Sequence, residues 1–491
     1  MVQSITNCSV FTSTMTVLRW VGVFLLFVVV LQFAQLNNFS RRITSRKNGT
    51  IQIKATPLLQ LDGGDHRRQY HEITFTNIGW NHPNKARAIN SRRSIATREF
   101  VDAVVAHKRF NAAAWMNNNN NNSNIANSGR PVLAFLDFDA CALLHYPLFG
   151  GVDGKVNTDT QHGRPAGRAF LDNICHMVDN VLQQQHISAL RHKDSRLVVL
   201  SCNGNGLHGR IHLPKWHCLH RNRNMTKYSK LVVGHLSATF DDVHASNDFG
   251  LPPWPVKQVH MQQKQLKDME DCIERPIEFS FKGRERIHGD FSGFHEYFGK
   301  MSKSNNNSNK YQIEFSREHY NKSPLQTGKQ KQIAPTPIHN QTLEQYYAWI
   351  MNSTFCLAPR GDVLYSVRFS EVMSAGCIPI VYSDGWVLPY DSHVVKDWDS
   401  VLVMIPQSEV NRTQEVIEKI SVERRCQMQK NVFEFYNNYV KNSSGRLDAI
   451  LQLMDARLNH QEGAMNVRHV PYACQDENGN KCIVHSPIVS S

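Results

Sequence analysis

The sequence predicts an α/β fold of two Rossmann-like domains, preceded by an N-terminal transmembrane helix and a polar stem. Three observations lead to this fold class. The chain has 491 residues, which suits two ordinary domains with linkers. Short runs rich in Val, Leu and Ile alternate with helical patterns, as they do in parallel sheets covered by helices. A hydrophobic segment near the N-terminus is close to the length that crosses a bilayer.

The hydrophobic segment runs from Trp20 to Leu36 and is apolar except for two glutamines. Since a spanning helix needs roughly 20 residues, we predict a cytosolic tail at residues 1–19 and a signal anchor at residues 20–36. A cleaved signal peptide is the alternative, because the strictly apolar part, Val21 to Leu31, has the length of a signal-peptide core. No small-x-small cleavage site follows that part. In either case the chain enters the secretory pathway.

Two signals disagree on how the chain is oriented. Only Arg19 precedes the span within its flanks, whereas a basic cluster follows it at residues 41–47, so the positive-inside rule places the bulk in the cytoplasm. Acceptor patterns for N-glycosylation favour the lumen instead, and they recur at Asn48, Asn121, Asn224, Asn306, Asn340, Asn352, Asn411 and Asn442. We therefore expect the chain beyond Leu36 to lie in the lumen of the secretory pathway.

The cysteines agree with a luminal location. Ten of the 11 cysteines follow the span, an even number that suits disulfides in an oxidising compartment. Cys474 and Cys482 flank the sequence QDENGNK, which predicts a small disulfide-closed turn. Buried free thiols are the alternative for the set. Because no Cys-x-x-Cys spacing occurs, a zinc site is not indicated.

Composition changes along the chain indicate its division. Residues 37–129 are polar and include the run NNNNNNSN, so we interpret them as a stem or flexible region. Two α/β domains are expected, at residues 130–270 and 271–460. A flexible insert is expected at about residues 302–335, and a tail at residues 461–491.

The elements of both domains follow in order. In the first, RPVLAFLDFDAC begins with a buried-type strand, RAFLDNICHMVDNVLQQQ has a helical apolar stripe, and RLVVLSC and SKLVVGHL are valine-rich strands. In the second, RPIEFSFKGRER predicts a strand and TLEQYYAWIMNS a helix. A strand, turn, helix, strand unit follows at residues 353–384, then the strand VLVMIP and one or two closing helices.

Net charge narrows the class of partner. The formal net charge of +13 and the pI of about 9.2 predict a surface that attracts polyanions. Nucleic acid is excluded as a partner for a luminal chain. Phosphorylated donors, anionic lipid and acidic polysaccharide remain, so an acidic glycan acceptor is one expectation. The alternative is that the positive charge resides in the stem and the insert.

The segment FCLAPRGDVLYSVRFSEVMSAGCIPIVYSDGWVLPYD carries the chemistry. The strand ends at Pro359, and Gly361 permits the tight turn that follows. A helix is predicted from Tyr365 to Ala375, with Gly376 as its C′ residue. The helix buries an apolar stripe and leaves two charged residues off it; the stripe is Phe369, Val372, Met373 and Gly376, and the charged residues are Arg368 and Glu371.

This unit predicts an anion site at the carboxyl edge of the sheet. Open α/β folds bind ligands there, and the N–H groups of a helix N-terminus favour phosphate. Arg360 adds a planar fork of donors, and Glu371 can accept hydrogen bonds from sugar hydroxyls. Together they suit a nucleotide diphosphate sugar. The alternative is a structural ion pair between Arg368 and Glu371 at the i, i+3 spacing.

The same segment resembles the signature of the exostosin-like glycosyltransferases. That signature combines a Cys-Leu-x-Pro-x-Gly turn, an Arg-x-x-Glu helix, Gly-Cys-Ile-Pro, an aspartate and Leu-Pro-Phe; here Tyr390 replaces the phenylalanine. Weaker similarities occur in NDFGLPPW and in RPIEFSFKGRER. The resemblance covers roughly Pro131 to Val440 and is strong from Asn352 to Asp399.

The resemblance implies a two-domain GT-B fold, with the acceptor mostly on the domain at residues 130–270 and the nucleotide sugar on the domain at residues 271–460. It also implies a single-pass type II Golgi membrane protein with a luminal catalytic part, which transfers a sugar with inversion and usually without an essential metal. The expected donor is a nucleotide sugar, UDP-linked, and the expected acceptor is a glycan or glycoprotein. Five residues of the motif carry over to donor binding: Arg360, Gly361, Ser366, Arg368 and Glu371. Three residues of the preceding strand carry over as its diphosphate-facing end: Lys282, Gly283 and Arg286.

The catalytic base does not carry over from the resemblance. An inverting displacement needs a carboxylate or histidine near the acceptor hydroxyl. Asp139, at the end of a buried-type strand, is the candidate, and an aspartate that only caps the next segment is the alternative. Asp137 and Asp139 also form an Asp-x-Asp pattern, which in the other large glycosyltransferase fold binds manganese, so metal dependence stays open.

A catalytically silent partner subunit of a Golgi glycosyltransferase complex is the rival function. Retention of Arg360, Arg368 and Glu371 favours donor binding but leaves the base unidentified. The transferred sugar, its acceptor, and assembly into homo-oligomers or hetero-oligomers are not determined by the sequence.

Overall fold

By its internal contacts, the computed structural model divides the chain into two compact units, Met1–Thr56 and Pro57–Ser491. All of the described residues belong to the second unit. The structure describes residues 70, 72–76, 98–110, 131–136, 175–176, 178–182, 190, 192–201, 217–220, 222–239, 243–244, 247–253, 261, 263–284, 292–304, 310–316, 343–361, 364–390, 394–459, 468–475 and 481–485.

The first sheet is parallel throughout and has the strand order β1-β2-β3-β4-β5. The predicted valine-rich and leucine-rich strands are confirmed, and β2 and β4 are buried along their whole length. Its strands are β1 (Glu72–Thr76), β2 (Val132–Leu136), β3 (Arg196–Ser201), β4 (Leu231–His235) and β5 (Phe249–Gly250). In the chain, helix α3 (Arg98–Ala106) lies between β1 and β2, and helix α7 (Met225–Tyr228) lies between β3 and β4.

The interpretation of residues 37–129 as a stem is wrong for part of that range. Strand β1 pairs in parallel with β2, and Ile73 is fully buried. Helix α3 buries Phe100 and Val104. An edge strand and a short helix need few apolar residues each. The polar composition of residues 37–129 therefore gave no sign of β1 and α3. The asparagine run at residues 117–124 lies outside the described residues.

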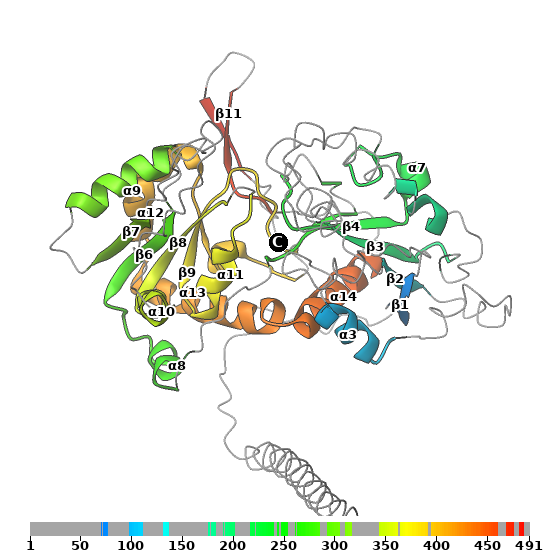
Figure 1. The fold of residues 1–491 in the computed structure, drawn as a ribbon, viewed down its shortest axis with the longest axis horizontal. Helices are drawn as coiled ribbons and strands as arrows, with labels where there is room; N and C mark the ends of the chain where they lie inside the picture. The colour runs from blue at the N-terminus through cyan, green and yellow to red at the C-terminus, as the bar shows by residue number, and fades with distance from the viewer. Residues whose placement is uncertain are drawn as a thin grey trace, which may run out of the picture. The chain divides into compact units, whose positions relative to one another are not determined.

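The second sheet is also parallel, with the order β10-β9-β8-β6-β7. Figure 1 shows α11 beside β8 and β9, the strands that precede and follow it. The strands are β6 (Ile277–Arg284), β7 (Tyr311–Ser316), β8 (Ser353–Pro359), β9 (Ile378–Tyr382) and β10 (Val403–Met404). The helices that accompany them are α8 (Gln263–Glu270), α9 (Ser292–Ser304), α10 (Leu343–Met351), α11 (Val367–Ser374), α12 (Thr413–Glu418) and α13 (Val422–Phe435).

The predicted flexible insert at residues 302–335 contains an ordered strand, so this prediction is wrong for β7. Tyr311 stacks on Phe279 of β6 with ring centroids 4.5 Å apart, and Phe315 lies 5.3 Å from Phe281. Strand β7 is an edge strand, and its aromatic side chains pack on those of β6. Polar residues on both sides of it in the sequence are the reason that the strand was not predicted. Residues 317–335 lie outside the described part.

The C-terminal part returns to the first sheet. After α13, a π-helical turn (Tyr436–Val440) leads into α14 (Ser443–Asn459), which packs against α3. Two arginines of α14 donate to carbonyls around β5: Arg446 to Pro252 and Pro253, and Arg457 to Asn247 and Asp248. Helix α14, at the end of the second domain, is thus bonded to the residues that flank β5.

The predicted tail at residues 461–491 is partly ordered, which corrects that expectation. Val470 is fully buried and exchanges backbone hydrogen bonds with Gly385 and Trp386. A hairpin of β11 (Tyr472–Gln475) and β12 (Lys481–Val484) follows. This segment is short and polar in composition, and its order comes from contacts made with residues far away in the chain.

Three disulfides join described cysteines: Cys175–Cys218, Cys272–Cys426 and Cys356–Cys377. Cys482 is also disulfide-bonded, and the hairpin register sets Cys474 opposite it, as the predicted closed turn requires. Within the described ranges, no helix is both long and apolar enough to span a membrane. The predicted anchor at residues 20–36 lies outside those ranges.

Candidate functional site

The turn between β8 and α11 forms as its sequence predicts. The Arg360 backbone N–H donates to the Tyr382 carbonyl at 3.0 Å, and the Gly361 N–H donates to the Tyr365 carbonyl at 3.1 Å. Ser366 is the N-cap of α11, and its hydroxyl accepts from the Arg368 N–H. The helix begins at Val367 rather than at Tyr365, because the cap residue itself lies outside the helical backbone region.

The predicted packing face of α11 is confirmed. Phe369, Val372 and Met373 are at most 1% exposed. Gly376 follows the C-cap with a φ of +61°, in the left-handed region that favours glycine at the C′ position. The helix is thereby fixed on the sheet, and its N-terminal turn lies at the carboxyl end of β8.

Segments that follow β4 and β5 contact this turn and helix. The Leu364 N–H donates to the Ser237 hydroxyl at 3.2 Å, and the Ser370 hydroxyl donates to the Pro253 carbonyl at 2.6 Å. Parallel strands end at the same edge of a sheet, so residues after β4 and β5 and residues after β8 come from the carboxyl ends of their sheets. Both sheets therefore contribute to the surroundings of α11.

The two charged residues of α11 have different partners. The Arg368 guanidinium lies 4.6 Å from the Phe281 ring centroid and 5.7 Å from that of Tyr346. The Tyr346 hydroxyl donates to Glu371 Oε2 at 3.1 Å. Among the described residues no ion pair joins Arg368 to Glu371, so the alternative of a structural i, i+3 pair is not observed. Instead, Arg368 keeps its N–H donors available for a ligand.

The end of β6 lies next to Arg368. Lys282 Nζ is 3.4 Å from Glu314 and 5.5 Å from the Trp349 ring centroid. A Cβ at Gly283 would lie 2.6 Å from Phe281 Cζ and 3.2 Å from an Arg368 guanidinium nitrogen. The close approach of these two side chains explains why this position has no side chain.

A pocket lies between α10, α11 and β6. Its lining includes Phe281, Lys282, Tyr346, Trp349 and Arg368. The pocket is small, with a volume of about 10 Å³, and it brings aromatic rings beside two cations, a combination that suits contact with an anionic group. The sequence reasoning did not select Tyr346 and Trp349. Their i, i+3 spacing in TLEQYYAWIMNS is the signal that could have indicated a shared helix face.

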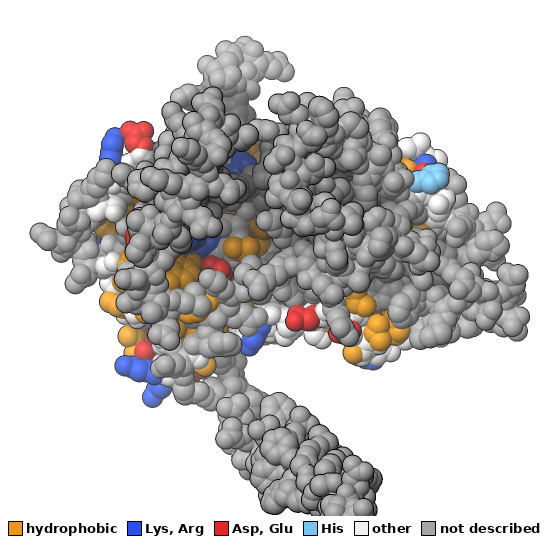
Figure 2. Space-filling view, viewed as in Figure 1, with side chains coloured by type: hydrophobic (Ala, Val, Ile, Leu, Met, Phe, Trp, Pro, Cys, Tyr) orange, Lys and Arg blue, Asp and Glu red, His pale blue; other side chains and the backbone are white. Residues whose placement is uncertain are grey.

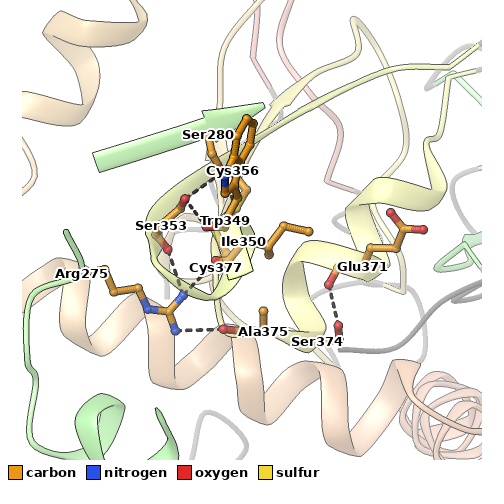
Figure 3. Close-up of a disulfide and its surroundings, with 10 residues drawn as sticks. All are labelled: Arg275, Ser280, Trp349, Ile350, Ser353, Cys356, Glu371, Ser374, Ala375 and Cys377. Atoms are coloured by element: carbon orange, nitrogen blue, oxygen red, sulfur yellow. Dashed lines mark hydrogen bonds between the residues drawn. A yellow bond between two sulfur atoms is a disulfide. The ribbon is translucent and has the colours of Figure 1, made fainter. Parts of the chain in front are cut away.

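A disulfide and a buried arginine connect the strands and helices that line the pocket. The Cys356–Cys377 disulfide joins β8 to the residue before β9. Figure 3 shows the Arg275 guanidinium between Ser353 and Ala375, whose carbonyls it contacts at 2.9 Å each. Burial lowers the pKa of Arg275 to about 10, so it remains charged near neutral pH.

Three sequence candidates lie outside the described residues. They are Arg286, Asp137 and Asp139. The assignment of Asp139 as base therefore stays a prediction, as does the contribution of Arg286 to donor binding. The other predicted donor residues occupy β6, the turn after β8 and α11.

One group of potential metal ligands occurs among the described residues, away from this pocket. Atoms of Cys175, His217 and Cys218 lie within 4.8 Å of one another. The two cysteines form a disulfide, and the His217 Nδ1 accepts from the Leu219 N–H. The thiolate ligands that zinc prefers are therefore absent from this group, and its residues do not fit a metal site.

Residues 210–420 match the family profile described as the exostosin GT47 domain. The chain is 30% identical over 117 residues to an exostosin-1 homolog of Caenorhabditis elegans, covering 24% of this chain and 30% of that protein. It is 39% identical over 79 residues to exostosin-1 of Drosophila melanogaster, covering 16% of this chain and 10% of that protein. With human exostosin-2 the identity is 27% over 120 residues, covering 24% and 16%. These curated relatives are matched over less than a third of their length.

Two solved structures overlap the fold at low similarity. The GtfA/B complex has a TM-score of 0.29 at 12% identity, covering 58% of this chain and 61% of that chain. WaaG, a glycosyltransferase involved in lipopolysaccharide biosynthesis, has a TM-score of 0.28 at 12% identity, covering 67% and 92%. The family match does not depend on them. Residues 210–420 are therefore similar to the exostosin glycosyltransferase domain.

Proposed function

We propose that the chain is an inverting glycosyltransferase that moves a sugar from a nucleotide diphosphate sugar to a glycan or glycoprotein acceptor. The observation that carries the proposal is the state of Arg368. Its guanidinium stacks on Phe281 with no ion-pair partner among the described residues, beside Glu371 and the N-terminus of α11. A guanidinium that contacts an aromatic ring and keeps its N–H donors for a ligand suits a diphosphate.

Each predicted donor residue has a role in this proposal. Arg360 and Arg368 neutralise the diphosphate, while Gly361 and Ser366 shape the turn and the start of α11 from which these arginines extend. Glu371 accepts hydrogen bonds from hydroxyls of the transferred sugar. Lys282, Gly283 and Arg286 are proposed to face the diphosphate. A UDP-linked donor is proposed, without a requirement for a divalent metal.

The reaction is a single displacement. The acceptor oxygen forms a bond to the anomeric carbon as the bond from that carbon to the diphosphate oxygen breaks, and the electron pair leaves with the nucleotide. The acceptor proton passes to a base, for which we propose Asp139. Arg360 and Arg368 stabilise the negative charge that grows on the leaving diphosphate. A GT-B arrangement, with the acceptor on the N-terminal domain, provides the reaction cleft.

The proposed location is the Golgi lumen, with a type II anchor at residues 20–36. The disulfides and the recurring glycosylation acceptors support an oxidising, glycosylating compartment. Treatment of protein from eukaryotic cells with a deglycosylating enzyme should increase its mobility on a gel. Unchanged mobility would contradict the luminal location.

An acidic acceptor is a finer proposal, motivated by the formal net charge of +13. Figure 2 shows Lys and Arg side chains interspersed with Asp and Glu over the described part of one face. We therefore base the proposal on net charge alone. Transfer to an acidic acceptor should fall steeply as salt rises, because the screening length shrinks to about 8 Å near physiological ionic strength. A flat profile in protein lacking residues 1–69 would remove the reason for preferring an acidic substrate.

A panel of nucleotide sugars tests the function itself. The purified protein is incubated with each donor, with and without glycan acceptors, and release of nucleotide is measured. Acceptor-dependent release from one donor supports the transferase. Donor binding with no release under any acceptor would favour the silent partner subunit instead, and absence of binding to every donor would overturn both.

A further inference from the structure

Tyr346, which neither the motif nor the helix α11 contains, contacts both charged residues of the proposed donor site. Its hydroxyl donates to Glu371 Oε2 at 3.1 Å, and its ring centroid lies 5.7 Å from the Arg368 guanidinium. The two contacts use different parts of the side chain. The hydroxyl orients a carboxylate, and the ring covers a cation.

The contact leaves one carboxylate oxygen of Glu371 for a ligand. Glu371 is 8% exposed, yet no described residue forms a hydrogen bond with its Oε1. Figure 3 shows the Glu371 carboxylate extending away from its own backbone carbonyl, which accepts from Ser374, and from the disulfide. A carboxylate held at one oxygen cannot rotate freely, so its second oxygen has a fixed direction.

Two aromatic rings lie close to the Arg368 guanidinium. The Phe281 ring centroid is 4.6 Å from it, and the Tyr346 ring centroid is 5.7 Å from it. Aromatic rings on a guanidinium restrict its rotation while leaving the N–H donors of its edge accessible. The rings therefore aim the donors of Arg368 without neutralising its charge.

Helices α10 and α11 cannot easily separate, so this geometry exists before a ligand binds. Arg275 bonds the Ser353 carbonyl, just after α10, and the Ala375 carbonyl, at the end of α11. The Cys356–Cys377 disulfide closes the same region covalently. A site whose side chains are fixed in advance loses less conformational entropy when it binds a ligand.

We infer that Tyr346 is a positioning residue of the donor site, which orients Glu371 toward the sugar through its hydroxyl and Arg368 toward the diphosphate through its ring. This inference rests on the proposed function. Burial raises the pKa of Tyr346, so its hydroxyl remains a hydrogen-bond donor across the physiological range. The two contacts can be tested separately, because the hydroxyl acts on the sugar through Glu371 and the ring acts on the diphosphate through Arg368.

Two substitutions separate these contacts. Tyr346→Phe removes the hydroxyl and keeps the ring, whereas Tyr346→Leu removes both. Binding is measured by calorimetry with UDP alone and with the UDP-sugar that binds wild-type protein most tightly in a panel of UDP-sugars. Tyr346→Phe should weaken UDP-sugar binding by about three- to tenfold and leave UDP binding unchanged. Tyr346→Leu should weaken the binding of both probes.

The neighbouring Tyr347→Phe is the matched control, since it removes a hydroxyl from the same helix, and the hydrogen bond to Glu371 and the ring contact with Arg368 are made by Tyr346. It should change neither affinity. In a Glu371→Gln background, Tyr346→Phe should cause a smaller loss than in wild-type protein, because the two groups act as a pair.

Two failures are distinguishable. If wild-type protein binds no UDP-sugar and no UDP, the proposed function fails. If wild-type protein binds and Tyr346→Phe binds the UDP-sugar equally well, or loses UDP and UDP-sugar affinity by the same factor, the positioning role is overturned while the proposed function stands. Thermal unfolding of each variant shows whether an affinity change comes from loss of the fold.

Discussion

At the scale of single residues, Arg368 and Glu371 have no ion-pair partner in the described part of the chain. Arg368 stacks on Phe281, and Glu371 takes a hydroxyl from a tyrosine rather than a cation from its own helix. An ion pair between them would have offset the charges that a diphosphate and sugar hydroxyls need. Because Arg368 and Glu371 do not pair with each other, both charges are available to a ligand.

Arg360→Ala and Glu371→Gln should each weaken donor binding without unfolding the protein. Loss of a hydrogen bond that involves a charged group costs about 1.5 to 3 kcal/mol, which corresponds to roughly a ten- to hundredfold lower affinity. Calorimetric titration with the donor measures it. Arg412→Ala, which removes an arginine exposed beside α12, serves as control. Wild-type affinity in both site variants would argue against this donor site.

Gly283→Ala should lower both stability and donor affinity. The added Cβ would lie 2.6 Å from Phe281 Cζ, and the Phe281 ring is packed against Phe294 and Phe315, so it has little room to move. Overpacking of this kind costs about 1 to 3 kcal/mol, measured by urea unfolding. Gly293→Ala in α9 is the control, because nothing lies within 4 Å of its Cβ position. Equal stabilities of the two variants would contradict the steric argument.

At the scale of elements, the arrangement of α10, β8, α11 and β9 is held by a covalent bond and a buried cation. Cys356 and Cys377, 21 residues apart, close the loop that contains the donor turn and α11. Arg275 bonds the carbonyls of Ser353 and Ala375 from beneath. The donor residues of α11 thus sit on a unit that is fixed at both ends.

The double substitution Cys356→Ala with Cys377→Ala should reduce the free energy of unfolding by about 3 kcal/mol, because a loop of this length gains entropy when it is no longer closed. Donor affinity should fall as well, since α10 and α11 become less fixed. Removing Cys272 and Cys426 together should also destabilise the protein but leave donor affinity unchanged, because that bond joins the loop after α8 to α13. If both double variants lose donor affinity, or if neither does, the Cys356–Cys377 disulfide has no specific role in fixing the donor site.

At the scale of the whole molecule, a buried charge cluster shapes the segment that runs past β5. Arg223 donates to both carboxylate oxygens of Asp248, at 2.8 and 2.7 Å, and neither side chain is exposed. Asp248 also accepts from the Val233 and His244 N–H groups. The segment it fixes continues to the two proline carbonyls that Arg446 contacts. The cluster therefore supports the contact of α14 with the first sheet.

Asp248→Asn should destabilise the protein by about 3 to 5 kcal/mol, because the Arg223 charge would stay buried without its partner. Burial alone would raise the pKa of Asp248, but the charge of Arg223 and hydrogen bonds from His235 and Arg223 outweigh it and hold that pKa well below its usual range. The stabilisation is therefore present above the unfolded pKa of about 3.9 and is lost as pH falls toward the folded value.

Urea unfolding across pH measures this effect. Wild-type protein should lose stability more steeply than Asp248→Asn as the pH falls below about 4. Glu415→Gln should leave stability nearly unchanged at neutral pH, because its pairs with Arg412 and Lys419 are exposed and screened. Parallel pH profiles of wild-type protein and Asp248→Asn would refute the role of this carboxylate.

The sequence by itself determined the elements whose signal is local. Long apolar runs predicted β2, β3, β4 and β8, and the helical stripe with Gly376 predicted α11 and its end within two residues. The family signature identified Arg368 and Glu371 as a pair in the same helix. These features depend on side-chain periodicity and on backbone conformations, which neighbouring residues decide.

Only the tertiary structure decided which distant residues meet. Strands β1 and β7 were missed because an edge strand needs few apolar residues, and its order comes from pairing with strands elsewhere in the chain. The contact of Tyr346 with Glu371 spans 25 residues, and the Arg446 contact with Pro252 spans 194. No local pattern encodes such contacts, since they exist only once the sheets have formed and brought their carboxyl ends to the same edge.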